Sequence, residues 1–97
     1  MAKGYWIVHV EVRDAETYDR YRAAVGAALD DFGGRFLVRG GGSEIREGSL
    51  NPRSVVIEFP SLADATACYD SPAYRSAKAI RDAAAEAQLV IAEGYDG

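Results

Sequence analysis

The sequence contains few of the residues that metal and thiol chemistry require. It has one cysteine and one histidine in 97 residues. A single cysteine, Cys68, cannot form an internal disulfide or a zinc site, and one histidine with scattered carboxylates is a poor metal ligand set. We therefore expect no bound metal and no cofactor, and we interpret Cys68 as a small buried residue of a helix.

Runs of basic residues and long apolar segments are also missing. The chain carries 11 lysines and arginines against 15 acidic residues, for a net charge of −4. Binding to phosphate backbones or anionic lipids needs a basic footprint, so we exclude nucleic acid and membrane as main partners. No apolar run approaches the roughly 18 residues of a membrane span, and "MAKGYW" lacks the pattern of a signal peptide. We expect a cytoplasmic protein with a single domain, residues 1–97.

What the sequence does have is a regular alternation of apolar patterns. Dense β-branched and aromatic residues predict strands over residues 4–12, 35–39 and 53–59, and "QLVIAEGY" (88–95) predicts a fourth. Between the second and third strands lies the glycine-rich "GGGSEIREGSLNP". We expect a bend or bulge at residues 40–42, with residues 43–47 continuing the strand pairing. No GK[ST] motif or helix start follows these glycines, so a phosphate-binding loop is not indicated.

Two helical segments separate these strands. The first begins at the N-cap residue Asp14 and ends at Gly33-Gly34. Its apolar stripe recurs every three or four residues and comprises Tyr18, Tyr21, Val25, Leu29 and Phe32. The second begins at Ser61 and is interrupted and restarted at Ser71-Pro72, because proline breaks a helix interior but suits its first turn.

The order β-α-β-β-α-β predicts the fold. On one antiparallel sheet with both helices on the same side, it is the ferredoxin-like arrangement, an α+β class. One face of the four-stranded sheet is then left uncovered, and we call it the helix-free face. Such a small domain gains from covering that face with a partner.

Strand residues alternate between the two faces, so the sequence assigns most side chains. Trp6, Val8, Val10, Val12, Phe36, Val38, Val55, Ile57 and Phe59 are expected on the helix-covered face. Tyr5, Ile7, His9, Glu11, Arg35, Leu37, Arg39, Ser54, Val56 and Glu58 are expected on the helix-free face. The two faces of the fourth strand are too alike to assign.

The helix-free face mixes aliphatic and charged side chains, which allows two interpretations. In one, it faces water, or it is a dimer interface in which arginine and glutamate pair and the aliphatic side chains are buried. In the other, two such sheets face each other and enclose a pocket lined by His9, Arg39 and Glu58. Interfaces and ligand pockets both favour apolar linings with a few placed polar groups, so composition does not separate them.

Several segments in order resemble one known family. "KGYWIVHVEV", "GGRFLVRGG", "REG", "VVIEFPS", "YDSPAYRSAKAIR" and "VIAEG" are similar to the domain-of-unknown-function 1330 family of the dimeric α/β-barrel superfamily, over residues 3–94. The resemblance implies a ferredoxin-like subunit whose sheet pairs with a second copy, giving a homodimer. It also implies that the "SPxY" turn places Tyr74 where a pocket mouth could lie. It supplies no reaction.

The residues of the helix-free face suit proton transfer on a small anionic or phenolic molecule. His9 is the natural general acid or base, Arg39 suits a carboxylate or enolate oxygen, and Glu58 could hold Arg39 in place. We take these three as candidate catalytic residues. Tyr5, Glu11, Arg35 and Tyr74 are candidate substrate-binding residues.

Two hypotheses stay open. In the first, the protein is a cofactor-independent enzyme of isomerase, lyase or monooxygenase type, and His9→Ala abolishes turnover. In the second, it is a non-catalytic dimeric module that binds or senses a small ligand, and Arg39→Ala weakens binding more than His9→Ala. Each candidate residue also has a purely structural interpretation, and for Arg39 with Glu58 this is a buried ion pair.

Overall fold

Four strands and three helices follow one another in a computed structural model that describes residues 2–96. They are β1 (Gly4–Val12), α1 (Ala15–Asp30), β2 (Arg35–Arg39), β3 (Arg53–Phe59), α2 (Leu62–Asp70), α3 (Pro72–Ala84) and β4 (Ala85–Glu93). The second helical segment is indeed divided at Ser71, into α2 and α3. The last strand begins three residues earlier than the sequence predicted, directly after α3.

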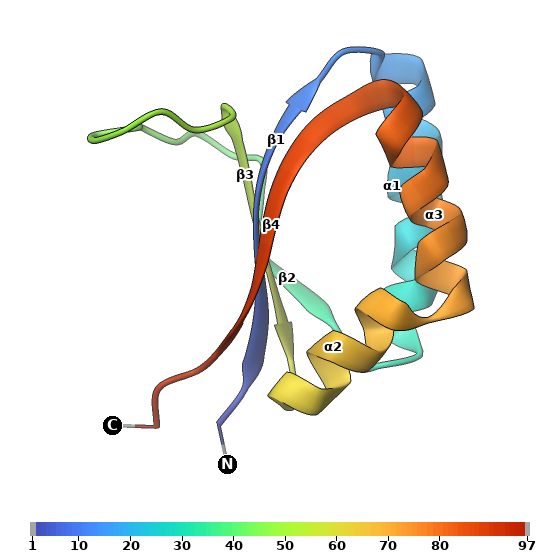
Figure 1. Ribbon diagram of the computed structural model, residues 1–97, viewed down its shortest axis with the longest axis vertical. Coiled ribbons are helices and arrows are strands. Elements are labelled where there is room, and N and C mark those ends of the chain that lie inside the picture. The colour runs from blue at the N-terminus through green and yellow to red at the C-terminus, as the bar shows by residue number, and fades with distance from the viewer. Residues whose placement is uncertain (1, 97) are drawn as a thin grey trace.

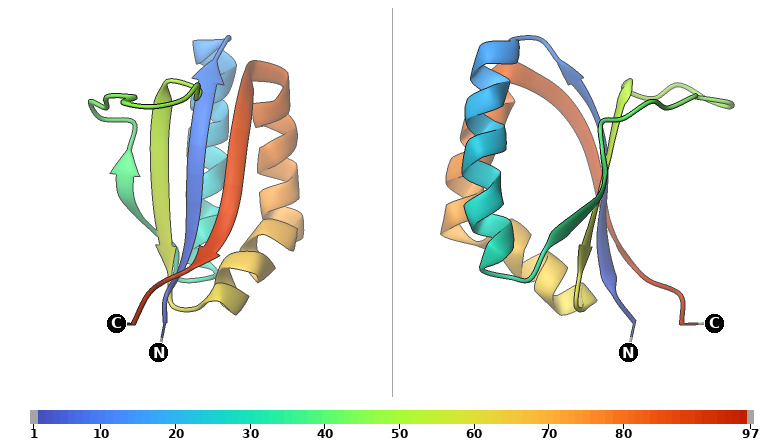
Figure 2. Two further views of the ribbon diagram at one scale, coloured as in Figure 1. Left: turned by 60° about the vertical axis from the view of Figure 1, so that its left-hand side comes forward. Right: turned by 180° about the vertical axis from the view of Figure 1, so that it is seen from behind.

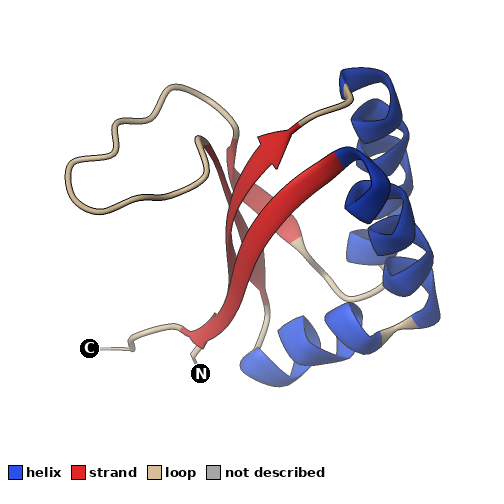
Figure 3. Ribbon diagram, turned by 45° about the horizontal axis from the view of Figure 1, so that its top comes forward, coloured by secondary structure: helices blue, strands red, loops and turns tan. Residues whose placement is uncertain are grey.

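The strands form one antiparallel sheet in the order β2-β3-β1-β4. All three helices lie on the same side of it, with α1 and α3 side by side, as Figures 1 and 3 show. The predicted ferredoxin-like fold and its helix-free face are therefore confirmed.

Side-chain caps set the helix boundaries. Asp14 accepts a hydrogen bond from the Thr17 amide (3.3 Å), and Ser61 accepts one from the Asp64 amide (3.1 Å). Ser71 accepts from the Tyr74 amide (3.2 Å) while its hydroxyl donates to the Cys68 carbonyl (2.7 Å). One serine thus terminates α2 and initiates α3, because it satisfies backbone groups at both ends.

Trp6 is the centre of the core between sheet and helices. Its side chain is almost fully buried, and its indole N–H donates to the carbonyl of Ala65 in α2 at 2.9 Å. Its ring lies 5.0 Å from that of Phe59 and 4.7 Å from that of Tyr74, measured between centroids. A buried indole contributes packing energy through its ring, and its N–H forms a hydrogen bond of defined orientation. Trp6 therefore fixes how α2 and α3 lie on β1.

The predicted alternation holds along β1 and β3. Trp6, Val8, Val10, Val55, Ile57 and Phe59 are buried beneath the helices. The structure also assigns β4, where Leu89 and Ile91 pack against the core and Val90 points to the helix-free face, 54% exposed.

Strand β2 breaks the alternation, and two face assignments were wrong as a result. Phe36 pairs with Ile57, but the next pair is Val38 with Val56, so Leu37 is an extra residue that forms a β-bulge. After the bulge, Val38 shares the face of Val56 and is 41% exposed. Arg39 pairs with Val55 and lies on the helix-covered face. A bulge reverses the parity of every residue that follows it, which a period-two count cannot register.

The glycine-rich segment also differs from the prediction. Strand β2 ends at Arg39, and residues 40–52 form a loop in which residues 43–47 continue no strand. This loop projects from the sheet on the side opposite the helices, as Figure 2 shows. The bulge lies at Leu37 and not at the glycines.

We predict that Gly40→Ala destabilises the protein by about 1 kcal/mol, because a left-handed backbone conformation is unfavourable for residues with a Cβ. The backbone φ of Gly40 is +72°, and a Cβ there would collide with the guanidinium of Arg53. Gly41→Ala is the matched control, since a Cβ at Gly41 meets nothing within 4 Å. Denaturant unfolding of both variants tests this, and equal stabilities would contradict it.

Candidate functional site

Three of the predicted site residues meet on the helix-free face. Glu58 accepts hydrogen bonds from Arg35 Nε at 2.9 Å and from the Tyr5 hydroxyl at 3.1 Å. The hydrogen bond from Arg35 is the main cause that lowers the pKa of Glu58. The ion pair of Glu58 is therefore with Arg35, and the expected pairing with Arg39 was wrong.

His9 and Glu11 occupy the same face but have separate partners. His9 Nδ1 lies 3.2 Å from the Ser54 hydroxyl on the neighbouring strand. Glu11 lies 3.6 Å from Arg13, which also binds Glu86 at 2.6 Å. Glu11 and Glu86 are opposite each other in the β1–β4 register, so Arg13 screens two adjacent like charges.

The other two predicted residues, Arg39 and Tyr74, lie on the helix side of the sheet. Tyr74 is completely buried under α3 and is not at a rim. Arg39 stacks on Phe36, with its guanidinium carbon 4.1 Å from the ring centroid. The constellation of His9, Arg39 and Glu58 is thus divided between the two faces of the sheet.

A cavity lies between the sheet and the helices, beside Tyr74. Its walls are apolar side chains of all four strands and of α1, among them Trp6, Val8, Val25, Phe36 and Leu89. Four arginines, from α1, β2, β3 and α3, supply nearly all of its polar groups: Arg22, Arg39, Arg53 and Arg81. The space open to the centres of water molecules is about 30 Å³. We call it the arginine-lined cavity.

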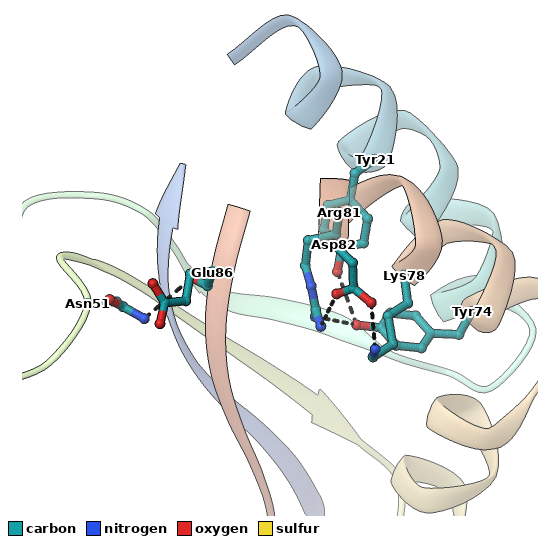
Figure 4. A network of polar contacts seen from close by, with 7 residues as sticks. All are labelled: Tyr21, Asn51, Tyr74, Lys78, Arg81, Asp82 and Glu86. Carbon is teal, nitrogen blue, oxygen red and sulfur yellow. Dashed lines mark hydrogen bonds and ion pairs between the residues drawn. The ribbon is translucent and has the colours of Figure 1, made fainter. Parts of the chain in front are cut away.

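Arg81 is the buried member of this set. Its side chain is 7% exposed, and it donates through Nη1 to the Tyr74 hydroxyl at 2.8 Å. The Tyr74 hydroxyl in turn lies 3.3 Å from that of Tyr21, which lines the cavity. Figure 4 shows the three side chains meeting between α1 and α3. Burial raises the pKa of both tyrosines, so both stay protonated near neutral pH.

Apart from Arg22, which lies 3.5 Å from the Asp19 carboxylate, the arginines of the cavity are short of acceptors. The Nε atoms of Arg53 and Arg81 are buried without a hydrogen-bond partner. No carboxylate is part of the cavity lining within residues 2–96; Asp82, half exposed, reaches Arg81 Nη2 from outside at 3.5 Å. Neither Arg39 nor Arg53 has an ion-pair partner in that range, and Arg53 lies over the Tyr18 ring at 5.7 Å. Buried N–H groups normally have partners, so these arginines mark a place for an acceptor.

The positions of two arginines within apolar patterns of the sequence indicate this cavity, whereas their residue type alone does not. Arg53 has the same parity as Val55 and Ile57, which places it on the helix-covered face. Arg81 falls on the apolar stripe of its helix with Tyr74, Ala77 and Ala84. A charged residue at a core position of both a strand and a helix is the pattern that indicates a buried polar site.

The structure also bears on the expectations for Cys68, for metal ligands and for membrane-spanning helices. Cys68 is fully buried, as predicted, and burial raises the pKa of its thiol to about 11. Within residues 2–96, no three side chains of His, Cys, Asp or Glu gather as metal ligands would. In the same range the helices are too short or too polar to span a bilayer.

The fold and this cavity define a ferredoxin-like α+β protein with an arginine-lined pocket under its helices. Residues 3–95 match the model of the domain of unknown function DUF1330, and the chain belongs to that family. No curated protein was found to match the sequence.

Similar solved structures share the fold. The RPA0582 protein of unknown function from Rhodopseudomonas palustris is 21% identical, with a TM-score of 0.78 over 99% of this chain and 85% of that one. A dimeric ferredoxin-like protein of unknown function from Bacteroides fragilis is 18% identical, with a TM-score of 0.62 over 94% and 95% of the two chains. SnoaB, a cofactor-independent oxygenase from Streptomyces nogalater, is 11% identical, with a TM-score of 0.67 over 100% and 97%.

We predict that Glu58→Gln lowers the melting temperature at neutral pH and that the difference vanishes in acid. Arg35 lowers the folded-state pKa of Glu58 below the ordinary value of 4.5. A lowered carboxyl pKa stabilises the fold above the unfolded-state pKa, and this stabilisation is lost as the pH falls through the folded-state pKa. Thermal unfolding between about pH 7 and pH 3 measures it.

The control for this experiment is Glu47→Gln, since Glu47 is exposed in the loop of residues 40–52. The melting temperature of this variant should stay close to that of the wild type at every pH measured. A Glu58→Gln difference that is independent of pH would contradict the ion-pair explanation.

Proposed function

We propose that the protein binds a small organic anion in the arginine-lined cavity. One observation carries the proposal: within residues 2–96, four arginines and no carboxylate line this space, and two of the buried Nε atoms lack a partner. A buried guanidinium without an acceptor is costly, and a carboxylate or enolate oxygen supplies that acceptor through charge-assisted hydrogen bonds.

The apolar walls strengthen the case for an organic ligand. Trp6, Phe36 and the aliphatic residues around them form most of the lining, and an inorganic ion makes no use of such walls. The free space of about 30 Å³ accommodates only a small molecule in the conformation described. Arg22 and Arg39 are exposed at the edge of the cavity, so a ligand enters there by displacing flexible side chains.

The position of the cavity on the helix side of the sheet bears on whether the protein is an enzyme. His9 was the expected general base, but it lies across the sheet from the arginines. The binding or sensor module is therefore the better-supported hypothesis. A cofactor-independent enzyme is the second candidate, favoured by the fold shared with the oxygenase SnoaB and by the Tyr21 hydroxyl at the cavity wall.

We further propose that the helix-free face binds a second copy of the chain. The strand registers align one aliphatic residue from each strand in a row across the sheet: Val38, Val56, Ile7 and Val90. Val38 and Val90 are largely exposed, and Leu37 at the bulge is 47% exposed. Polar residues flank the row on both sides, an apolar centre with a polar rim. The Bacteroides fragilis protein, which shares the fold, is described as dimeric.

The binding proposal predicts that a simple carboxylate such as propionate stabilises the wild type. At a concentration of about 100 times its dissociation constant, the gain in unfolding free energy is about 2.7 kcal/mol. Arg81→Met should weaken binding at least tenfold, and Arg39→Met should also weaken it. Calorimetric titration and thermal shift measure both effects. Arg81 also donates to Tyr74 and contacts Asp82, so thermal unfolding of Arg81→Met without ligand is measured alongside, to show that the variant is folded.

Two controls come from the helix-free face. Arg35 lies on the same strand as Arg39 but on the opposite face, so Arg35→Met should leave propionate binding unchanged, as should His9→Ala. If no carboxylate binds, or if the Arg35 and Arg39 variants lose affinity equally, the cavity is not the binding site.

The assembly proposal predicts a monomer when the aliphatic row is interrupted by charge. Val90→Lys should shift the mass measured by light scattering from twice the chain mass to the chain mass, because a lysine cannot be buried unpaired at the centre of an interface. Leu62→Lys on α2 is the control, since Leu62 is an exposed apolar residue on the helix side. A wild type that is monomeric at all concentrations would contradict the proposal.

A further inference from the structure

The hydrogen-bond chain from Arg81 through Tyr74 to Tyr21 has a fixed direction. A guanidinium can only donate, so the Tyr74 hydroxyl oxygen accepts from Arg81. The Tyr74 proton then needs an acceptor in a fully buried position. Within residues 2–96, the Tyr21 oxygen is the one acceptor within reach of that hydroxyl.

In the opposite direction, one buried hydroxyl proton would lack an acceptor. If Tyr21 donated to Tyr74, the Tyr74 proton would point into the core with no partner, which buried polar groups avoid. With Tyr74 as donor, both hydrogen bonds of the chain are made and, of the two hydroxyl protons, that of Tyr21 is left over. Tyr21 lines the cavity, so its proton is available to whatever occupies that space. Arg81 therefore orients a hydroxyl two hydrogen bonds away.

The polar lining of the cavity consists almost wholly of donors. The four arginines donate only, Tyr21 donates because of the chain, and the Trp6 N–H is already used by the Ala65 carbonyl. Tyr18 is the exception, since its hydroxyl can turn either way. A ligand that satisfies these groups must bring acceptors to more than one of them.

We propose that Tyr21 selects anions that carry a second acceptor oxygen beside the carboxylate, so that the preferred ligands are small 2-oxo carboxylates. The carboxylate binds the arginines, and the neighbouring carbonyl oxygen accepts the Tyr21 proton. Arg81 Nη1 and the Tyr21 hydroxyl both contact the Tyr74 hydroxyl oxygen, at 2.8 Å and 3.3 Å, so the two donors are close enough for acceptor groups on adjacent carbons of one small molecule. This inference rests on the proposed anion binding and adds the class of anion.

The test compares pyruvate with propionate, which differ by the 2-oxo oxygen alone. The wild type should bind pyruvate about tenfold more tightly, the usual effect of one added hydrogen bond to a buried donor. Tyr21→Phe should bring the ratio of the two affinities close to one, because the donor that distinguishes the two ligands is then absent. Tyr74→Phe should lower the ratio as well, because Tyr21 is then free to turn its proton away. Tyr69→Phe is the control, since Tyr69 packs against Trp6 and Tyr74 but does not line the cavity.

The outcomes separate this inference from the proposed function. If propionate does not bind, anion binding itself fails. If propionate binds but pyruvate binds no more tightly, or if both tyrosine variants keep the preference, the role of Tyr21 is overturned while anion binding stands. Lactate has a hydroxyl in place of the oxo group, and lactate binding as tight as pyruvate would overturn the assignment to 2-oxo acids.

Discussion

A sheet covered by helices on one side only divides the side chains of every strand between two environments. In β1 this places Trp6 in the core and His9 on the open face, three residues apart in the chain but on opposite sides of the sheet. The rest of the structure depends on this division. The helices cover the apolar set, and Arg39 and Arg53, which share its parity, lie on the same side of the sheet, Arg53 partly buried and Arg39 exposed at the edge. Glu11, Glu58 and Glu86 remain outside, where Arg13 and Arg35 pair with them.

The buried arginines oppose folding, and the core offsets their cost. Desolvating a guanidinium is expensive, and Asp82 compensates Arg81 only from the exposed side of α3. The aromatic cluster of Trp6, Phe59 and Tyr74 lies beside this charge and supplies packing energy. A buried ion pair is weak evidence for stability, so the proposed anion gives this charge a role that packing does not.

The sequence was sufficient for the architecture because the fold follows from local, periodic signals. The caps at Asp14, Ser61 and Ser71 and the alternation along β1 are read directly from residue types. The site was not predictable in the same way. His9 and Glu58 attracted attention as chemistry-bearing residues, yet the cavity forms where Arg53 and Arg81 meet from distant elements. Their convergence is a tertiary property, and only their unusual positions on apolar faces indicated it.

The bulge at Leu37 connects the two faces of the molecule. Strand β2 has an arginine at each end, four residues apart, and regular alternation would place both on the same face. The extra residue sends Arg35 to Glu58 on the open side and Arg39 to the cavity. It also exposes Leu37 and Val38 beside the aliphatic row of the helix-free face. A bulge is tolerated where it redirects a side chain, and here one inserted residue places Arg39 at the arginine-lined cavity on one side and apolar surface on the other. The proposed binding site and the proposed assembly surface therefore depend on the same local irregularity, although the sheet keeps their residues apart.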